Sequence, residues 1–210
     1  MRKHPSPHQQ DGLTGKPTVL ESWWRTHSAT VALLRDACAR IEEAEDRIRQ
    51  LEGLAASDYI TGLMNRRGFE NFYEREVARL HRYRTQGGLL VLIDLDRFKA
   101  INDTHGHAAG DACLKHVGKK LMSCIRATDG AARLGGDEFA LFLTQTDPFR
   151  AASRVEKIRA TLDEISLKWE GETLRLRASM GFEHVTGDAD FSAIYTLTDK
   201  ALYADKGRRK

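Results

Sequence analysis

The sequence predicts an α/β domain, with some of its strands antiparallel, that follows a long N-terminal helix. From residue 57 onward, patterns typical of strands alternate with patterns typical of helices. Within that region Gly135 and Gly136 interrupt a strand pair, and adjacent glycines suit the positive φ angles of a tight hairpin turn. Before residue 57, apolar residues recur in heptads, which predicts the helix.

Composition narrows the class of protein. The 210 residues suffice for one domain and an appendage, and 41% hydrophobic residues are too many for a disordered chain. Lys and Arg number 33 against 30 Asp and Glu, so the chain lacks the basic excess of a dedicated nucleic-acid binder. No apolar run is long enough to span a membrane, the start does not resemble a signal peptide, and the three cysteines form no CxxC pair. We therefore expect a cytoplasmic protein with neither a nucleic-acid partner nor a membrane span.

The N-terminal quarter of the sequence contains two segments with different predicted structures. Residues 1–19 hold three of the four prolines and predict a disordered leader. Residues 20–56 predict a helical coiled-coil stalk, because the apolar stripe is narrow and its period is close to 3.5. The alternative is a helix that packs against its own domain. His27 and Thr30 interrupt the a and d positions of the heptads. The apolar residues at those positions are Leu20, Trp23, Leu34, Ala37, Ile41, Ala44, Ile48, Leu51 and Ala55.

The elements of the domain follow in order. Helical patterns occur over residues 66–84, 110–126 and 192–206, and strand patterns over 89–96, 132–143 and 173–185. One further helix is signalled by its start, because Asp147 is suited to an N-cap and Pro148 to the first helical position. We expect that helix to run to about residue 168.

Two aspartates, Asp94 and Asp96, end the most apolar of these strands. Residues two apart on a strand face the same side, so both carboxylates would project together. A carboxylate beside a buried strand is costly unless it is paired or bound to a metal, so the pair suggests a divalent-cation site. The alternative is that both acids form salt bridges or caps where the strand leaves the core, and this segment alone slightly favours it.

A second acidic group, Asp137 and Glu138, follows the two glycines of the predicted hairpin. Glycines let a phosphate or a metal approach the backbone, and the acids supply hard oxygen ligands. The same residues also suit a polar surface turn. Two acidic groups on neighbouring strands together raise the expectation of a two-metal site for phosphoryl transfer.

The loop after the first strand, residues 97–103, is suited to a nucleotide. Its backbone amides and Lys99 would hold a triphosphate. Asn102 and Asp111 suit the edge of guanine, because a carboxylate can accept hydrogen bonds from N1–H and N2–H together. The alternative is that Asn102 and Asp111 only cap turns and the following helix.

Five segments, in the same order and spacing, resemble the motifs of the GGDEF domain family, the diguanylate cyclases. Residues 133–139 read RLGGDEF and carry the family signature. The other segments are 58–67, similar to D-x-L-T-G-L-x-N-R-R; 94–103, similar to D-x-D-x-F-K-x-x-N-D; 106–111, similar to G-H-x-x-G-D; and 199–206, similar to D-x-A-L-Y-x-A-K. The resemblance covers the chain from residue 58 to its end.

The resemblance implies a fold and an activity for residues 57–210. The fold is a palm-like α+β domain with a mostly antiparallel five-stranded sheet flanked by helices, as in nucleotidyl cyclase palms. Two protomers, joined here through the N-terminal stalk, would each hold one GTP and together make cyclic di-GMP and two pyrophosphates. The implied cofactor is Mg²⁺, two ions in each half-site, with Mn²⁺ as a substitute.

Residue roles follow from the same resemblance. Asp94, the carbonyl of Leu95 and Asp137 would bind the metal, while Glu138 would complete that site or help deprotonate the attacking 3′-hydroxyl. Lys99 would offset charge on the reacting phosphorus. The remaining assignments are guanine recognition by Asn102 and Asp111, and phosphate binding by the backbone of Arg97 and Phe98 together with Lys99 and Lys206. The C-terminus departs from the family pattern, and Lys210 is assigned to phosphate there, with Arg208 and Arg209 as alternatives.

Arg126 and Asp129 match the R-x-x-D motif at which the family's product binds and inhibits. We expect product feedback there, with Lys157 or Arg159 as an additional cationic contact. The alternative is a salt bridge between two residues three apart at a helix end.

A second hypothesis for the function is a non-catalytic receptor that binds GTP or cyclic di-GMP and signals through the stalk. Degenerate members of the family lose the signature acids, whereas Asp94, Lys99, Asp137 and Glu138 are all present here. Their presence favours the enzyme.

Overall fold

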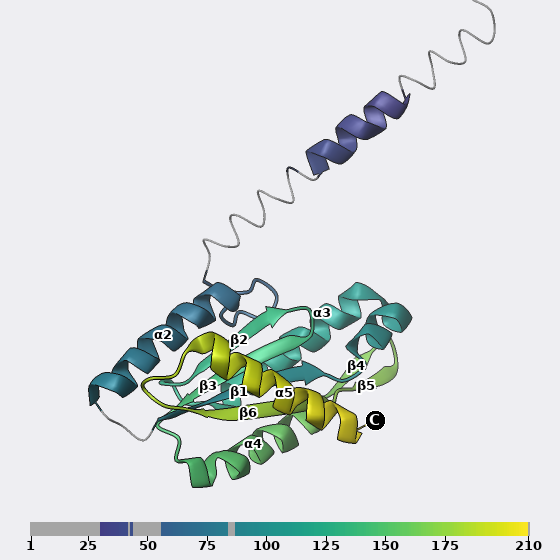
Figure 1. Ribbon diagram of the computed structural model, residues 1–210. Coiled ribbons are helices and arrows are strands. Elements are labelled where there is room, and N and C mark those ends of the chain that lie inside the picture. The colour runs from purple at the N-terminus through teal and green to yellow at the C-terminus, as the bar shows by residue number, and fades with distance from the viewer. Residues whose placement is uncertain (1–29, 42, 44–55, 84–86, 210) are drawn as a thin grey trace, which may run out of the picture. The chain divides into compact units, whose positions relative to one another are not determined.

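A computed structural model describes residues 30–41, 43, 56–83 and 87–209 of the chain, which divides into two compact units, Met1–Arg49 and Gln50–Lys210. In the first unit, residues 30–41 form a helix on which Leu34 and Ile41 are exposed (Figure 1). The predicted leader, 1–19, and most of the predicted stalk, 20–56, lie outside the described residues. None of the described helices is both long enough and apolar enough to cross a membrane.

The second unit is built on a four-stranded sheet in which every pairing is antiparallel and the order is β2-β3-β1-β6. The strands are β1 (Gly88–Leu95), β2 (Gly130–Gly135), β3 (Glu138–Thr144) and β6 (Ala178–Val185). Within the described part of the chain, the expected fifth strand does not join this sheet: β4 (Ser166–Trp169) and β5 (Glu172–Arg175) pair with each other as a separate hairpin. On the outer edge of β6, side chains take the place of a further strand as hydrogen-bond partners of the backbone. Asp205 accepts from the Met180 N–H, and Arg159 donates to the Ala178 carbonyl.

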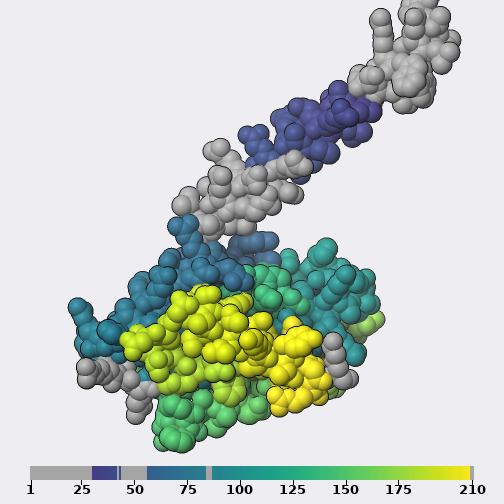
Figure 2. Space-filling view, in the orientation of Figure 1, coloured from purple at the N-terminus to yellow at the C-terminus, as the bar shows by residue number. Residues whose placement is uncertain are grey.

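Helices cover both faces of the sheet (Figure 1). They are α2 (Arg66–Tyr83), α3 (Phe98–Cys124), α4 (Pro148–Asp163) and α5 (Phe191–Arg209). Alternate residues of β1 point to opposite faces: Val91 and Ile93 join a core with α3 and α4, while Leu90 and Leu92 join a core with α2 and α5. Figure 2 shows the face that α2 and α5 cover. The central strand is therefore buried on both sides, as its continuous apolar run predicts.

Two helix boundaries differ from the sequence prediction. Helix α4 begins as expected, with the Asp147 carboxylate accepting from the Phe149 N–H, but it ends at Asp163 because the following residues form β4. Helix α3 begins at Phe98, so the predicted loop 97–103 is mostly helical. A break at Gly106, with φ of 81°, divides α3 into two parts.

The segment before α2 lies along the outer edge of β2. Met64 pairs in parallel with Ala132, donates its N–H to the Ala131 carbonyl at 3.1 Å, and accepts from the Arg133 N–H at 2.9 Å. Asp58 holds the preceding turn, since one of its oxygens accepts from both the N–H and the hydroxyl of Thr61. This edge of the sheet is therefore partly covered by the chain that leads into the domain.

Candidate active site

The acidic residues of the two motifs meet at one end of the sheet. Asp94, near the end of β1, is directly opposite Glu138, the first residue of β3. The Leu95 N–H donates to the Asp137 carbonyl at 3.2 Å. All four residues predicted to bind metal, Asp94, Leu95, Asp137 and Glu138, are therefore gathered where the β2–β3 turn meets the end of β1.

Asp94 lies in a mostly buried and strongly charged environment. Its side chain is 15% exposed, and the Nζ of Lys206 from α5 lies 2.8 Å from Oδ2. Burial is the main cause that raises the pKa of Asp94, and the charges of Asp137 and Asp96 raise it further against the opposing effect of Lys206. The Lys206 ammonium group therefore contacts a carboxylate that also lies close to the negative charges of Asp137 and Asp96.

Asp96 has a different environment from Asp94. Its Oδ1 accepts from the Ser179 hydroxyl at 2.7 Å, and its N–H donates to the Arg177 carbonyl at 2.9 Å. Asp96 therefore ties the end of β1 to β6, whereas Asp94 faces the lysine.

Arg133 fixes the glycine turn that carries Asp137. Its Nε donates to the Gly136 carbonyl at 2.9 Å, and its Nη1 lies 3.2 Å from Oδ2 of Asp58. Gly136 itself has φ of 50°, a left-handed conformation that favours glycine. The sequence pattern predicted no role for this arginine, although both Arg133 and Asp58 lie within the motifs that carry the family resemblance.

The residues predicted to hold phosphate surround the start of α3. Arg97 has φ of 58° and no side chain caps the helix, so its first N–H groups remain available to an anion. A non-glycine residue held at positive φ stores strain, which is typical of functional turns. Phe98 is buried, and Lys99 is exposed beside it.

Asn102 and Asp111, predicted to read guanine, come from the two parts of α3. A Cβ added to Gly110 would collide with Oδ1 of Asn102, so the asparagine amide lies directly on the residue that precedes Asp111. The break at Gly106 thus brings the Asn102 side chain against the residue next to Asp111.

The C-terminal basic residues divide into two groups. Lys206 reaches the acidic cluster, as described, whereas Lys210 lies outside the described residues. Arg208 is exposed and its Nε donates to the Ala204 carbonyl of its own helix at 3.4 Å.

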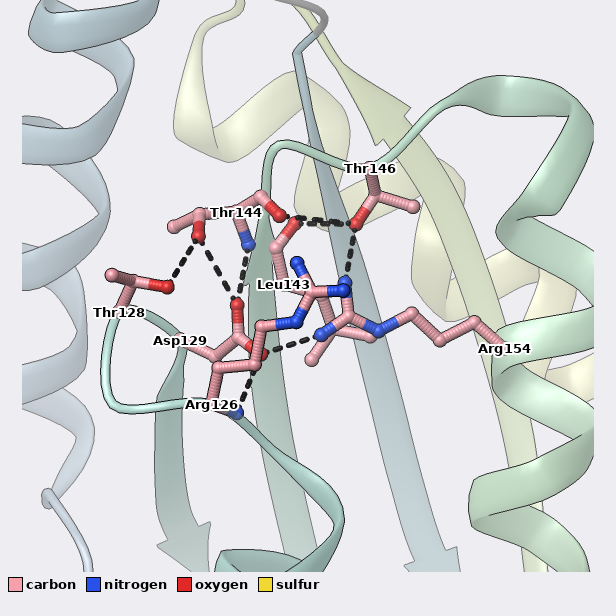
Figure 3. A network of polar contacts seen from close by, with 7 residues as sticks. All are labelled: Arg126, Thr128, Asp129, Leu143, Thr144, Thr146 and Arg154. Carbon is pink, nitrogen blue, oxygen red and sulfur yellow. Dashed lines mark hydrogen bonds and ion pairs between the residues drawn. The ribbon is translucent and has the colours of Figure 1, made fainter.

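The R-x-x-D residues lie at the opposite end of the sheet, between α3 and β2 (Figure 3). The Asp129 side chain is fully buried and lies 2.5 Å from Nη2 of Arg154 on α4. It also accepts from the N–H and hydroxyl of Thr144 and from the Arg126 N–H. The arginine that reaches Asp129 is therefore Arg154, while the side chain of Arg159 pairs with Asp205. Arg126 is exposed.

This arrangement agrees with the result of comparing the chain with known proteins. The sequence profile described as diguanylate cyclase, GGDEF domain, matches residues 55–210. The chain belongs to the GGDEF domain family. The match extends from the residues just before the Asp58 turn to the C-terminus, so it includes every residue of the acidic cluster and the R-x-x-D loop.

Named relatives and solved structures of GGDEF proteins are similar to this chain. Diguanylate cyclase DosC of Escherichia coli K12 is 33% identical over 184 residues, which cover 87% of this chain and 38% of DosC. DgcP of Pseudomonas aeruginosa PAO1 is 36% identical over 174 residues, covering 82% of this chain and 25% of DgcP. The chain therefore spans well under half the length of these two relatives.

Among solved structures, the coiled coil and GGDEF domain of DgcB from Caulobacter crescentus, in complex with c-di-GMP, superposes with a TM-score of 0.67 and 28% identity. That match covers 85% of this chain and 94% of the DgcB chain. The diguanylate cyclase SiaD of Pseudomonas aeruginosa, solved with its activator SiaC, gives a TM-score of 0.68 at 28% identity, covering 90% of this chain and 73% of SiaD.

Proposed function

We propose that this chain is a diguanylate cyclase that condenses two GTP molecules into cyclic di-GMP and two pyrophosphates. The observation that carries the proposal is the acidic cluster of Asp94, Asp137 and Glu138 at the end of the sheet where Lys206 and the start of α3 also lie. Acids suited to a cation thus lie close to groups suited to phosphate. A receptor that binds only cyclic di-GMP would have no need of both.

The donors at this site fit a hard divalent cation such as Mg²⁺. They are carboxylates and a backbone carbonyl, and the charge of Asp137 already acts on Asp94. Among the described residues, no three His, Cys, Asp or Glu side chains are gathered closely enough to hold a metal. We infer that Asp94, Asp137 and the Leu95 carbonyl hold it, with Glu138 turning inward. When bound, Mg²⁺ would stabilise negative charge on the transferring phosphoryl group.

The reaction is a nucleotidyl transfer repeated twice. The 3′-hydroxyl oxygen of one GTP forms a bond to the α-phosphorus of the other, and the bond from that phosphorus to the β-phosphate bridging oxygen breaks, releasing pyrophosphate. The hydroxyl proton passes to Glu138 or to water. Lys99 and Lys206 would offset the charge that grows on the phosphoryl oxygens, and the first N–H groups of α3 would orient the triphosphate.

Two half-sites must face each other, because each protomer would hold one nucleotide. The apolar side chains of Leu34 and Ile41 are exposed on the described N-terminal helix, with 61% and 58% of their surface accessible. Pairing of two such helices would bury them and raise the effective concentration of the domains to roughly millimolar. Replacing Leu34, Ile41 and Ile48 with polar residues should abolish dimerisation and specific activity together, measured by sedimentation and by product formation.

The direct test is to incubate the full chain, stripped of bound nucleotide, with GTP and Mg²⁺ and to separate the nucleotides by chromatography. We expect cyclic di-GMP and pyrophosphate in a one-to-two ratio. Asp137→Asn should lose at least about 100-fold in rate, whereas Glu74→Gln, an exposed carboxylate on α2, should match the parent. A dimeric preparation that makes no cyclic product would overturn the proposal.

Product feedback is the second part of the proposal. The exposed guanidinium of Arg126 would contact the product, while the buried carboxylate of Asp129 would hold the loop that presents it. Arg126→Ala should keep its initial rate but lose most of its inhibition by added cyclic di-GMP. Arg175→Ala, an exposed arginine on β5, is the control, and equal inhibition of both variants would remove the assignment.

A further inference from the structure

Asp205, the residue before Lys206, departs from the family pattern and forms polar contacts within the fold. The motif D-x-A-L-Y-x-A-K has alanine immediately before its lysine, and this chain has Asp205 there. The carboxylate is only 18% exposed, so it needs partners within the fold.

Asp205 contacts residues of two different elements. Its Oδ2 lies 2.8 Å from Nη1 of Arg159 on α4, and the same oxygen accepts from the Met180 N–H of β6 at 2.9 Å. Arg159 in turn donates to the Ala178 carbonyl at 3.5 Å, and its side chain is only 12% exposed. The ion pair therefore sits on the outer edge of β6 and satisfies two backbone groups that have no strand beside them in the described fold.

This pair joins the two helical layers of the domain. Helix α4 packs on one face of the sheet and α5 on the other, with β6 as the edge strand between them (Figure 1). An arginine from α4 and an aspartate from α5 meet around that edge. The last turns of α5 are thereby fixed to β6 and to α4.

The ion pair of Asp205 and Arg159 lies close to the acidic cluster. Met180, which Asp205 holds, is adjacent on β6 to Ser179, the strand partner of Asp94. Lys206 follows Asp205 directly and reaches Asp94 with Nζ at 2.8 Å. A lysine side chain has several rotatable bonds, so where its ammonium group rests depends strongly on how well its backbone is held.

We infer that Asp205 and Arg159 are positioning residues that fix the backbone of Lys206 and so direct its ammonium group to the acidic cluster and to the phosphates of GTP. The inference rests on the proposed function for the phosphate contact. It assigns to this chain a support for Lys206 that a family pattern with alanine at this position does not have. Neither residue is expected to touch the nucleotide.

The test compares Asp205→Ala, Arg159→Gln, Lys206→Ala and the double variant Asp205→Ala/Lys206→Ala in the full chain. We expect Asp205→Ala and Arg159→Gln to raise KM for GTP by about three- to tenfold and to change kcat less than twofold. The double variant should be no worse than Lys206→Ala alone, because both changes act through the same ammonium group. Glu156→Gln is the matched control, since Glu156 is the other acid that pairs with Arg159, at 3.1 Å, but it lies on α4 itself.

A second measurement does not depend on activity. In buffer without nucleotide or metal, the shift in urea midpoint caused by Lys206→Ala should be smaller in the Asp205→Ala background than in the parent. Additive midpoint shifts, or an unchanged KM in an active enzyme, would overturn the inference. If the parent makes no cyclic product, the proposed function fails while the urea comparison still decides the placement of Lys206. Asp205→Asn, which keeps an acceptor for the Met180 N–H, replaces Asp205→Ala in both measurements if the alanine variant does not fold.

Discussion

The two ends of the central sheet hold buried carboxylates in opposite ways. At one end, Asp94 has a single lysine for several acids, and its pKa is raised mainly by burial. At the other end, Asp129 accepts from a backbone amide and a hydroxyl of Thr144, from the Arg126 N–H and from Arg154. The two ends are separated by the length of β3, about 20 Å at the usual rise per residue.

The difference separates a binding role from a structural one. A carboxylate that is fully supplied with donors gains little from a further cation and costs much to disturb. A carboxylate that has too few partners lowers the free energy of unfolding of the ligand-free protein. Such groups are typical of functional sites. Asp94 is therefore suited to the metal of the proposed function, whereas Asp129 holds a loop in place.

Replacing Asp129 should have the largest effect on folding. Asp129→Asn leaves the guanidinium of Arg154 without its carboxylate partner, and we expect the free energy of unfolding to fall by about 3 kcal/mol in urea titrations. Thr144→Val removes only one of the donors and should cost about 1 kcal/mol. Equal losses for both variants would mean that the ion pair is not the main stabilising contact.

Replacing Asp94 should have the opposite effects, a large loss of activity without a loss of stability. Asp94→Asn should reduce cyclic di-GMP formation by at least about 100-fold, because a proposed metal ligand is lost. Its unfolding midpoint in metal-free buffer should stay the same or rise, because the ionised carboxylate is disfavoured by burial and by its acidic neighbours. A large loss of stability would contradict the contrast between the two ends.

Gly110→Ala should weaken recognition at the ligand-binding end without unfolding it. The new Cβ would displace the flexible amide of Asn102, which can move at little cost to stability. We expect KM for GTP to rise about tenfold, equivalent to ~1.4 kcal/mol, with a denaturation midpoint close to the parent. An unchanged KM would show that Asn102 does not contact the base.

The Tyr73 hydroxyl is a third kind of buried polar group. Among the described residues nothing hydrogen-bonds its hydroxyl, although its ring packs edge-on against Phe142 and Phe191. Tyr73→Phe keeps that packing, so we expect a gain of about 1 kcal/mol in unfolding free energy at neutral pH.

The same residue predicts a pH dependence. Burial, with the charge of Asp190, raises the pKa of Tyr73 to about 12 from 10.0. The unfolded chain would then lose this proton at lower pH than the folded chain, so stability falls as pH rises from about 10 to 12. Unfolding titrations of Tyr73→Phe should show a smaller fall over that range, and identical falls would contradict the assigned burial.

Local signals explain what could be predicted from the sequence. Asp147 and Pro148 mark the start of α4, and Gly135-Gly136 marks the β2–β3 turn, because capping and positive φ depend on residues close in the chain. The acidic cluster was predictable for a related reason, since Asp94 lies at the end of an apolar strand and Asp137 and Glu138 directly follow the glycine turn.

Contacts between segments that are distant in the sequence were harder to predict from it. The end of α4 could not be placed, because residues 166–169 become a strand only by pairing with β5. Several basic residues lie on α4, and the choice of Arg154 as the partner of Asp129 depends on where β3 ends, at Thr144, and on Thr146 just beyond it. Asp205 gave no signal of its role beyond its departure from the motif.

The covered edges of the sheet bear on how the folded chain avoids aggregation. An open strand edge is a template on which a second chain can extend the sheet. Here Met64 pairs with the outer side of β2, and Asp205 and Arg159 occupy backbone groups on the outer side of β6. Association of two such domains through added strands is therefore disfavoured at both of these places.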